Sequence, residues 1–171
     1  MSKYKYHIQE FPAGWIGLVG SELGLRRAAL KPTPQEVLED LESDMDGAEH
    51  DAGFFGETVA RLERYINGDL EALVDIALDL EDAPPFFRAA WSACRTIPPG
   101  ETRSYRWLAA EAGNARAVRA AGQAMARNRF VLIIPCHRVI SSDGGLGGYG
   151  GGGLGVKAKL LQMELDRASA E

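Results

Sequence analysis

Two adjacent prolines near the middle of the chain, Pro84 and Pro85, most strongly limit its fold. A proline has no backbone N–H and fixes φ, so helices and central strands seldom run through such a pair. The prolines follow the acidic segment Glu81–Ala83, and this composition is typical of a linker. A chain of 171 residues suits one large domain or two small ones. We therefore predict an N-terminal domain at 1–81, a linker at 82–85 and a C-terminal domain at 86–171.

The N-terminal half has the patterns of a small α/β domain, a sheet with flanking helices. Apolar and polar residues alternate at Tyr4–Ile8, which predicts a half-buried strand. Thr33 and Glu36 have the spacing of a capping box, so we expect a helix that begins at Pro34 and fades near Asp46. A second helix should bury Phe55, Val59, Leu62 and Ile66 and end at Asn67–Gly68. Further strands are expected at Trp15–Val19, Leu23–Leu30 and Asp75–Leu80.

The C-terminal half is expected to be mostly helical. Helices are predicted over Phe86–Arg95, from Ser104 as the cap to Ala112, and over Ala115–Arg127. The tight turn at Gly113–Asn114 joins the last two of these into a helix-turn-helix unit. A final amphipathic helix is predicted from about Val156 to Arg167.

Charge is spread unevenly along the chain, whose formal net charge is −5. Residues 1–85 carry 7 basic and 18 acidic side chains, whereas residues 86–142 carry 9 arginines and only Glu101 and Glu111. A basic block inside an acidic protein is typical of an anionic partner such as nucleic acid. A solvated arginine-rich surface has the same composition, so charge alone leaves both interpretations open.

A polar stripe runs along the helix expected at Ala115–Arg127. Its members recur at helical spacing: Arg116, Arg119, Gln123 and Arg127. The opposite face is rich in alanine, and small side chains let a helix approach another surface closely. The stripe and the helix-turn-helix pattern together favour contact with DNA over a helix that binds nothing. The glycine-rich segment Gly144–Gly155 is either a disordered linker or a loop whose backbone approaches a ligand. Its place shortly after Cys136 favours the loop.

Cys136 is the candidate nucleophile. It follows the apolar run Val131–Ile134, which we expect to be a buried strand, and directly precedes His137. A free cysteine has a pKa of about 8.5, so nucleophilic use at neutral pH needs a base or a positive charge nearby. His137 can supply the base, and Glu164 on the final helix can orient the imidazole. A Cys-His pair alone is weak support, because free cysteines are usually core residues, as we expect for Cys94.

Cysteine and histidine usage also limits the class of protein. Two cysteines provide no disulfide framework and no four-cysteine zinc site, and the three histidines lack metal-ligand spacing, so no metal is expected. No apolar run approaches the roughly 20 residues of a membrane span. The N-terminus lacks the apolar core of a signal peptide. We expect a cytoplasmic, reduced protein that is neither secreted nor bound to a membrane, and one associated with the nucleoid if prokaryotic.

Residues Ile134–Val139 resemble the active-site motif of the O6-alkylguanine-DNA alkyltransferases, the methylated-DNA–protein-cysteine methyltransferases. Upstream, Ile97–Gly100 with Ser104-Tyr105 resembles the "IPxGxxxSY" segment of that family, and Arg119–Gly122 resembles the "RAxG" of its recognition helix. Asn128 lies eight residues before Cys136. Downstream, matching positions are Gly147–Tyr149, Lys157, Leu160-Leu161 and Glu164. The motifs agree in order and spacing over about residues 86–165, whereas the N-terminal half matches mainly in length and pattern.

The resemblance implies DNA repair by a single, irreversible displacement without a cofactor. Cys136 would attack the alkyl carbon on O6 of guanine and keep the alkyl group as a thioether, so each molecule would act once. His137 would deprotonate Cys136 through a water, with Glu164 orienting the imidazole. Tyr105 would donate a proton or hydrogen bond to the departing guanine.

The resemblance also implies that the partner is double-stranded DNA containing O6-alkylguanine. The target base would be flipped out, at a cost of about a few kcal/mol, while Arg119 fills its place and the recognition helix docks in the minor groove. Asn128 would brace the turn that leads to Cys136, and carbonyls near Cys136 and Val139 would hold the guanine amino group. Further substrate or DNA contacts are expected from Ser104, Arg116, Gln123, Arg127, Tyr149 and Gly150. By resemblance, the protein is a monomer with an RNase H-like N-terminal domain and a winged-helix-like C-terminal domain.

Three alternatives remain for the function. A non-catalytic protein that binds alkylated lesions would look similar, but such relatives replace the cysteine that stands here at 136. A DNA-binding regulator would use the helix-turn-helix, although 171 residues leave no room for a sensor domain. An unrelated thiol enzyme could bind small anionic substrates through its arginines.

Overall fold

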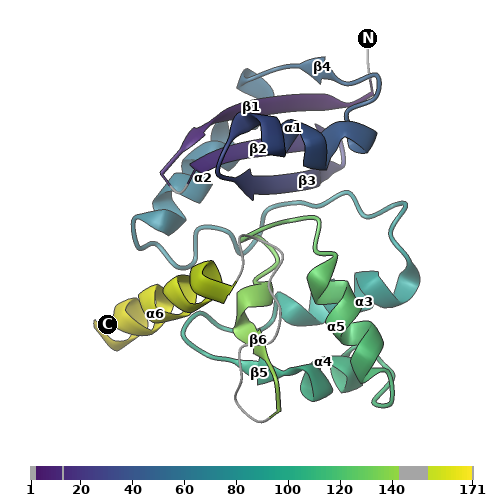
Figure 1. The fold of residues 1–171 in the computed structure, drawn as a ribbon, viewed down its shortest axis with the longest axis vertical. Coiled ribbons are helices and arrows are strands. Elements are labelled where there is room, and N and C mark those ends of the chain that lie inside the picture. Colours follow the sequence, from purple (N-terminus) through teal and green to yellow (C-terminus); the bar gives the residue numbers. More distant parts are fainter. Residues whose placement is uncertain (1–2, 13, 143–153, 171) are drawn as a thin grey trace. The chain divides into compact units, whose positions relative to one another are not determined.

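Three strands near the N-terminus form an antiparallel sheet: β1 (Lys5–Phe11), β2 (Gly14–Ser21) and β3 (Gly24–Lys31) (Figure 1). The two-residue strand β4 (Glu49–His50) pairs parallel to β1, which gives the order β3-β2-β1-β4. The strands expected near residues 4–8, 15–19 and 23–30 are therefore confirmed, whereas β4 was not predicted. The computed structural model describes residues 3–12, 14–142 and 154–170. Contacts divide the chain into two units, Met1–Leu80 and Glu81–Glu171.

Helix α1 (Pro34–Leu41) covers one face of this sheet. Its predicted start is confirmed, since the Thr33 side chain accepts a hydrogen bond from the Glu36 N–H at 3.2 Å. The helix is shorter than expected and passes into the 3-10 turn η1 (Glu42–Asp44). Val37 and Leu41 pack against β2, where a side chain at Gly17 would overlap both of them. Glycine at this position lets the helix lie close to the sheet.

The opposite face of β2 adjoins the segment before α2. A Cβ at Gly20 would lie 3.1 Å from the ring of Phe55, the last residue of η2 (Gly53–Phe55). Helix α2 (Gly56–Ile66) follows and buries Val59, Leu62 and Tyr65. The predicted helix is thus present, with Tyr65 rather than Ile66 as its last buried residue, and it ends at Asn67 as expected.

The strand predicted at Asp75–Leu80 is wrong. The segment makes one isolated bridge, between Leu25 and Leu78, through hydrogen bonds on both sides of Leu25. Pairing stops there because Asp79 turns its buried carboxylate towards β2 and β3. That carboxylate accepts hydrogen bonds from Ser21 Oγ at 2.6 Å and from Arg26 at 3.2 Å. The segment therefore pairs with β3 at the single bridge between Leu25 and Leu78 and does not form a strand.

The second unit is mainly helical. Helices α3 (Pro85–Cys94), α4 (Tyr105–Glu111) and α5 (Val118–Ala126) pack on one another, and the parallel pair β5 (Arg103–Ser104) and β6 (Val139–Ile140) lies beside α4. Helix α6 (Leu154–Ala170) packs on the 3-10 turn η3 (Cys136–Arg138). The coarse fold class is confirmed, as a sheet with flanking helices followed by a helical region.

Helix α5 begins later than the expected Ala115. The Asn114 side chain accepts a hydrogen bond from the Arg116 N–H at 3.1 Å, and the Asn114 carbonyl accepts one from the Ala117 N–H at 2.9 Å. These bonds close a turn after Gly113, whose φ is +101°. Arg116 therefore precedes α5. No helix among the described residues is long and apolar enough to cross a membrane.

Candidate active site

Cys136 lies in a tight turn and not at the end of a strand, so the strand predicted at Val131–Ile134 is wrong. The segment is buried, but two hydrogen bonds fold it back on itself, from Ile133 N–H to the Val131 carbonyl at 2.8 Å and from Ile134 N–H to the Phe130 carbonyl at 3.0 Å. Leu132 adopts a left-handed backbone with φ of +69°. That conformation interrupts an extended chain.

Asn128 organises this turn from a position just after α5. Its Oδ1 accepts a hydrogen bond from the Phe130 N–H at 2.8 Å. Its Nδ2 donates to the Ile134 carbonyl at 2.9 Å and lies 3.2 Å from Cys136 Sγ. One amide side chain therefore shapes the backbone before Cys136 and also contacts the sulfur.

The Cys136 thiol is nearly closed off from solvent, with 5% of the residue exposed. Burial raises the pKa of this thiol, and the Asn128 hydrogen bond and the Lys157 charge oppose that shift. The resting state at neutral pH is therefore the thiol. A nucleophilic sulfur needs a nearby group that takes the proton.

His137 and Arg138 converge on Glu164 of α6, and all three side chains are buried. His137 Nε2 lies 2.9 Å from Glu164 Oε2. Arg138 donates to both carboxylate oxygens, at 2.9 and 2.6 Å, and also to the Ile97 carbonyl at 2.8 Å. The arginine fork and the imidazole thus hold Glu164 from two sides.

The protonation states in this cluster follow from its contacts. Burial would raise the pKa of the Glu164 carboxyl, but hydrogen bonds from His137 and Arg138 outweigh it and hold that pKa well below its usual range. Burial lowers the pKa of His137 against the opposing effect of Glu164, which leaves the imidazole neutral at neutral pH. An ionised Glu164 can only accept a hydrogen bond, so Nε2 of His137 carries the proton and donates it to that carboxylate, and we assign Nδ1 as the basic nitrogen.

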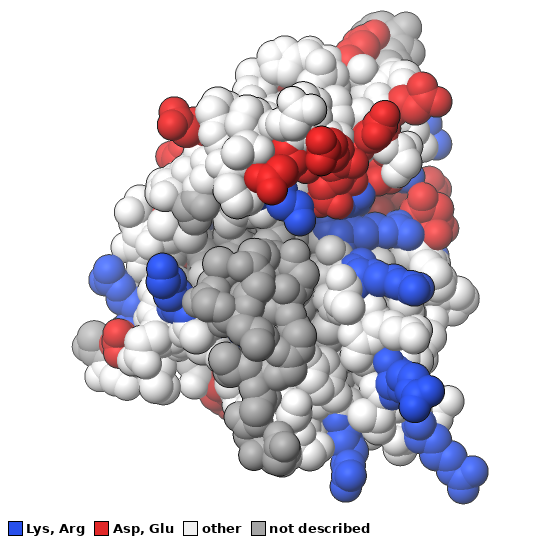
Figure 2. Space-filling model, viewed as in Figure 1, with Lys and Arg blue, Asp and Glu red and all other residues white. Residues whose placement is uncertain are grey.

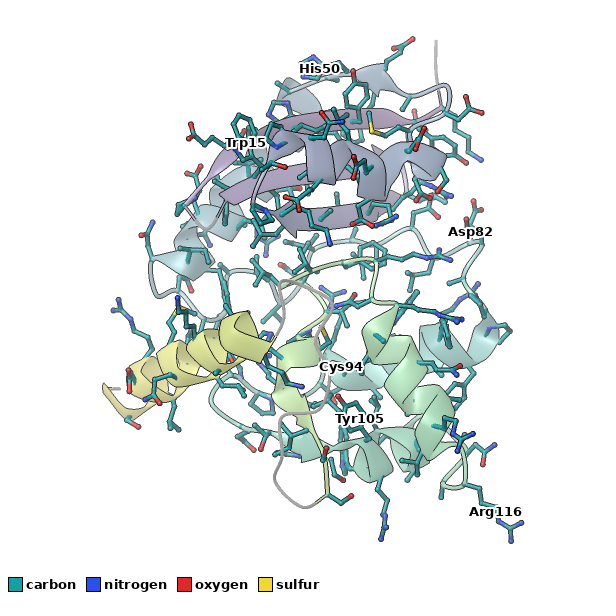
Figure 3. All side chains as sticks on the ribbon, in the orientation of Figure 1. Trp15, His50, Asp82, Cys94, Tyr105 and Arg116 are labelled. Carbon is teal, nitrogen blue, oxygen red and sulfur yellow. The ribbon has the colours of Figure 1, made fainter. Side chains whose placement is uncertain are left out.

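A second group surrounds the chain after Cys136. Lys157 of α6 is fully buried, and its Nζ donates to the Val139 carbonyl at 2.6 Å. The same Nζ lies 5.8 Å from the ring centre of Tyr105, the first residue of α4 (Figure 3). Burial, followed by the nearby Cys136, raises the pKa of Tyr105 and keeps the phenol protonated. Ser104 caps α4 by accepting a hydrogen bond from the Trp107 N–H at 3.0 Å.

The polar side chains expected to meet DNA lie at the surface of the helix-turn-helix. Arg119 and Gln123 belong to α5, Arg127 is its C-cap, and Arg116 projects from the preceding turn (Figure 3). All four are exposed. In Figure 2, basic side chains stand out over the region of α4 and α5. The predicted site residues therefore form a buried cluster around Cys136 and an exposed set on the helix-turn-helix.

Two predicted site residues, Tyr149 and Gly150, lie outside the described residues. Two residues of the buried cluster, Arg138 and Lys157, were given no role by the sequence. One signal could have found Arg138, because an ionised Glu164 on an inward helix face needs a basic partner. Lys157 stood in a matching tail position, but its contact with the Val139 carbonyl is a tertiary feature.

Cys94 matches its expected place in the core. It is fully buried in α3, and burial raises the pKa of its thiol. Among residues 3–12, 14–142 and 154–170, no group of three or more histidine, cysteine, aspartate or glutamate side chains is placed to hold a metal ion.

Comparison with known proteins places these residues in a family context. Residues 85–165 match the model of the 6-O-methylguanine DNA methyltransferase DNA-binding domain. A methylated-DNA–protein-cysteine methyltransferase of Methanosarcina barkeri is 41% identical over 162 residues, covering 93% of this chain and 96% of the relative. The O6-methylguanine methyltransferase of Mycobacterium tuberculosis has a similar structure, with a TM-score of 0.80, 36% identity, and coverage of 98% and 96% of the two chains. For the same organism's OGT in complex with DNA, the TM-score is 0.78 at 34% identity, with coverage of 95% and 94%.

Proposed function

Since the chain belongs to the methylated-DNA–protein-cysteine methyltransferase family, we propose that it transfers an alkyl group from O6-alkylguanine in DNA to its own Cys136. It is an enzyme of DNA repair by alkyl transfer. The assignment of Cys136 rests on its surroundings. Asn128 contacts its sulfur, and the next residue, His137, pairs with Glu164. A non-catalytic lesion-binding role is not favoured, because the relatives are named as methyltransferases.

The proposed reaction is one displacement at carbon. The Sγ–C bond forms as the C–O6 bond breaks, and the electron pair of that bond leaves with guanine. The thiol proton passes through a water to Nδ1 of His137, whose other nitrogen faces Glu164. Tyr105 donates a proton to the leaving base and is reprotonated from His137 or solvent. The alkyl group stays on sulfur as a thioether, so each molecule reacts once.

The target base is held by groups that lie after Cys136. The proposal assigns its amino group to the carbonyls of Cys136 and Val139. A carbonyl has two lone pairs, so Val139 can accept from the base while it accepts from Lys157. Ser104, Tyr149 and Gly150 complete the proposed contacts, and no cofactor is required.

Double-stranded DNA containing O6-alkylguanine is the proposed partner. The recognition helix α5 would dock in the minor groove, the target base would be flipped out, and Arg119 would occupy the space it leaves. Arg116, Gln123 and Arg127 would contact the backbone, which positions the protein without reading sequence. Their exposure on one helix-turn-helix supports this assignment.

Finer assignments of architecture and location belong to the same proposal. The N-terminal domain at 1–81 would be RNase H-like, and the domain at 86–171, after the linker at 82–85, would be winged-helix-like. The β5–β6 pair beside α4 supports the second of these. We propose that the protein acts as a cytoplasmic monomer, associated with the nucleoid if prokaryotic.

Intact-protein mass spectrometry after incubation with a duplex containing O6-methylguanine tests the proposed function. A mass gain of one methylene, mapped to Cys136 by peptide analysis, is the expected result. No gain with the duplex tightly bound would indicate a lesion-binding protein instead. No gain and no binding would indicate an unrelated thiol enzyme.

Replacement of Arg119 by alanine separates base flipping from chemistry. Reaction with the duplex should slow by about 10- to 100-fold, because unstacking costs a few kcal/mol and Arg119 offsets part of it. Reaction with free O6-methylguanine should change less than about twofold, since no stack is involved. Single-turnover rates with both substrates measure this, with Arg64→Ala in α2 as an exposed arginine control. Equal slowing with both substrates would contradict the flipping role.

Replacement of Lys157 by methionine tests the buried cation. Its charge lowers the pKa of Cys136, so its loss should raise that pKa and slow transfer at neutral pH by about tenfold. The rate of reaction with free O6-methylguanine, measured against pH, should rise at higher pH in the variant and approach the wild-type rate there. Lys159→Met, an exposed change on the same helix, serves as the control. An unchanged pH profile would exclude Lys157 from thiol activation.

A further inference from the structure

Arg129 follows the asparagine that contacts the reactive sulfur, and its own side chain is held at two points. Its Nη1 lies 2.9 Å from Asp82 Oδ1, near the start of the second unit. Its guanidinium carbon lies 5.5 Å from the ring centre of Trp91 in α3. The side chain is 29% exposed, so it is partly desolvated against the indole.

Trp91 is itself a fixed support. Its indole is buried, and its Nε1 donates to the Ala124 carbonyl near the end of α5 at 2.8 Å. Phe130 meets the same indole edge-on, with 6.0 Å between ring centres. Residues 129 and 130 therefore both contact Trp91, directly after Asn128. The chain that carries Asn128 is anchored on one rigid ring.

We propose that Arg129 is a positioning residue for alkyl transfer: its contacts with Asp82 and Trp91 hold Asn128 so that the amide faces Cys136 Sγ. The inference rests on the proposed function, because it gives a reason for placing that amide. An exposed ion pair alone contributes little. Here the ion pair fixes the guanidinium over an indole that also supports Phe130, so three contacts act on two consecutive residues.

The effect on the sulfur follows from hydrogen-bond chemistry. An amide N–H donated to sulfur favours the thiolate, so displacement of Asn128 favours the thiol. The other titratable groups around Cys136 are His137 in the same turn, Tyr105 on α4, Cys94 on α3 and Lys157 on α6, and none of them lies next to residue 129 in the chain. A change at residue 129 therefore acts on the sulfur through Asn128.

The test measures single-turnover transfer from free O6-methylguanine against pH, which leaves DNA binding out of the comparison. Arg129→Ala should react about tenfold more slowly at neutral pH, with the rise in rate displaced to higher pH and the deficit smaller there. Arg129→Lys keeps the cation but loses the planar guanidinium over the indole, so its rate should lie between those of wild type and Arg129→Ala. Asp82→Asn should slow the reaction less than Arg129→Ala. Its matched control, Glu101→Gln, removes a similarly exposed carboxylate paired with Arg103 and should have no effect.

A second readout separates the inference from the proposed function. The ultraviolet absorbance of the thiolate, taken as the difference from Cys136→Ser, titrates the sulfur without any alkyl transfer. Two results together would overturn the proposed function and keep the positioning role. The wild-type protein would fail to transfer the alkyl group, and the thiolate titration of Arg129→Ala would still lie at higher pH than that of wild type. An Arg129→Ala variant with the wild-type titration, or with a rate loss equal at every pH, would overturn the inference.

Discussion

Replacement of Cys136 by serine will abolish alkyl transfer and leave DNA binding nearly unchanged. A hydroxyl ionises far less readily than a thiol, and the neutral His137 is too weak a base to compensate. Loss of a nucleophile costs at least about 10⁴-fold in rate in well-studied enzymes. The affinity for duplex should stay within about twofold, because contacts to the DNA backbone dominate affinity and Cys136 is buried, unlike the exposed arginines.

Two measurements on one preparation check this result. Mass spectrometry after incubation with a duplex containing O6-methylguanine reports transfer, and a fluorescence titration of the same duplex reports binding. Cys94→Ala is the matched control, since it removes the other buried thiol and should retain full transfer to Cys136. A methyl group found on the Cys136→Ser protein would show that another residue is the acceptor.

Replacement of Glu164 by glutamine is expected to produce the largest loss of stability among the site variants. The change removes the charge that Arg138 and His137 share in a buried setting. Breaking one partner of a buried ion pair costs about 3–5 kcal/mol, because the remaining charge stays buried without compensation. Urea unfolding at neutral pH measures this, with Asp166→Asn on the exposed side of the same helix as control. A loss below about 1 kcal/mol, the range of exposed pairs, would contradict the buried clamp.

The same variant should also change how stability depends on pH. The Glu164 pKa is lowered in the folded protein, so its contribution is fully present above the unfolded value of about 4.3 and is lost as pH falls towards the folded value. Wild type and variant should therefore differ most at neutral pH and converge below about pH 4. The lowered pKa of His137 adds a separate loss as pH falls through about 6.5, since the unfolded chain binds that proton first. A wild-type to variant difference that is constant from pH 7 to pH 3 would refute the assignment of an ionised Glu164.

The sequence predicted those elements whose residues repeat with a period. Strands β1 to β3 and helices α1 to α6 each leave an alternating or helical pattern, so their existence could be inferred within a few residues. Strands β4, β5 and β6 are two residues long and carry no period at all. The strand predicted at Val131–Ile134 was wrong for a related reason. These residues are apolar because they are buried, and a hydrogen bond from the Asn128 side chain to the Ile134 carbonyl stabilises a turn there.

The candidate site was predictable where chemistry lies in single residues and unpredictable where it lies in contacts between them. Cys136, His137 and Glu164 carry recognisable functional groups, and the structure brings His137 and Glu164 within 2.9 Å. Arg138 directly follows His137 in sequence, yet its function as a clamp depends on its contact with Glu164 of α6. The placement of α5 was shifted by three residues because the Asn114 side chain closes a turn that helix propensity does not register.

The contact between Asn128 and Cys136 implies that alkylation of Cys136 changes the stability of the protein. The amide nitrogen lies 3.2 Å from a sulfur whose residue is only 5% exposed, so an alkyl carbon on that sulfur would compete with the amide for the same space. The same amide donates to the Ile134 carbonyl, so its displacement would also remove a hydrogen bond from the turn. Spent molecules would then carry a loosened turn, and fresh and used copies could be told apart by how readily they unfold.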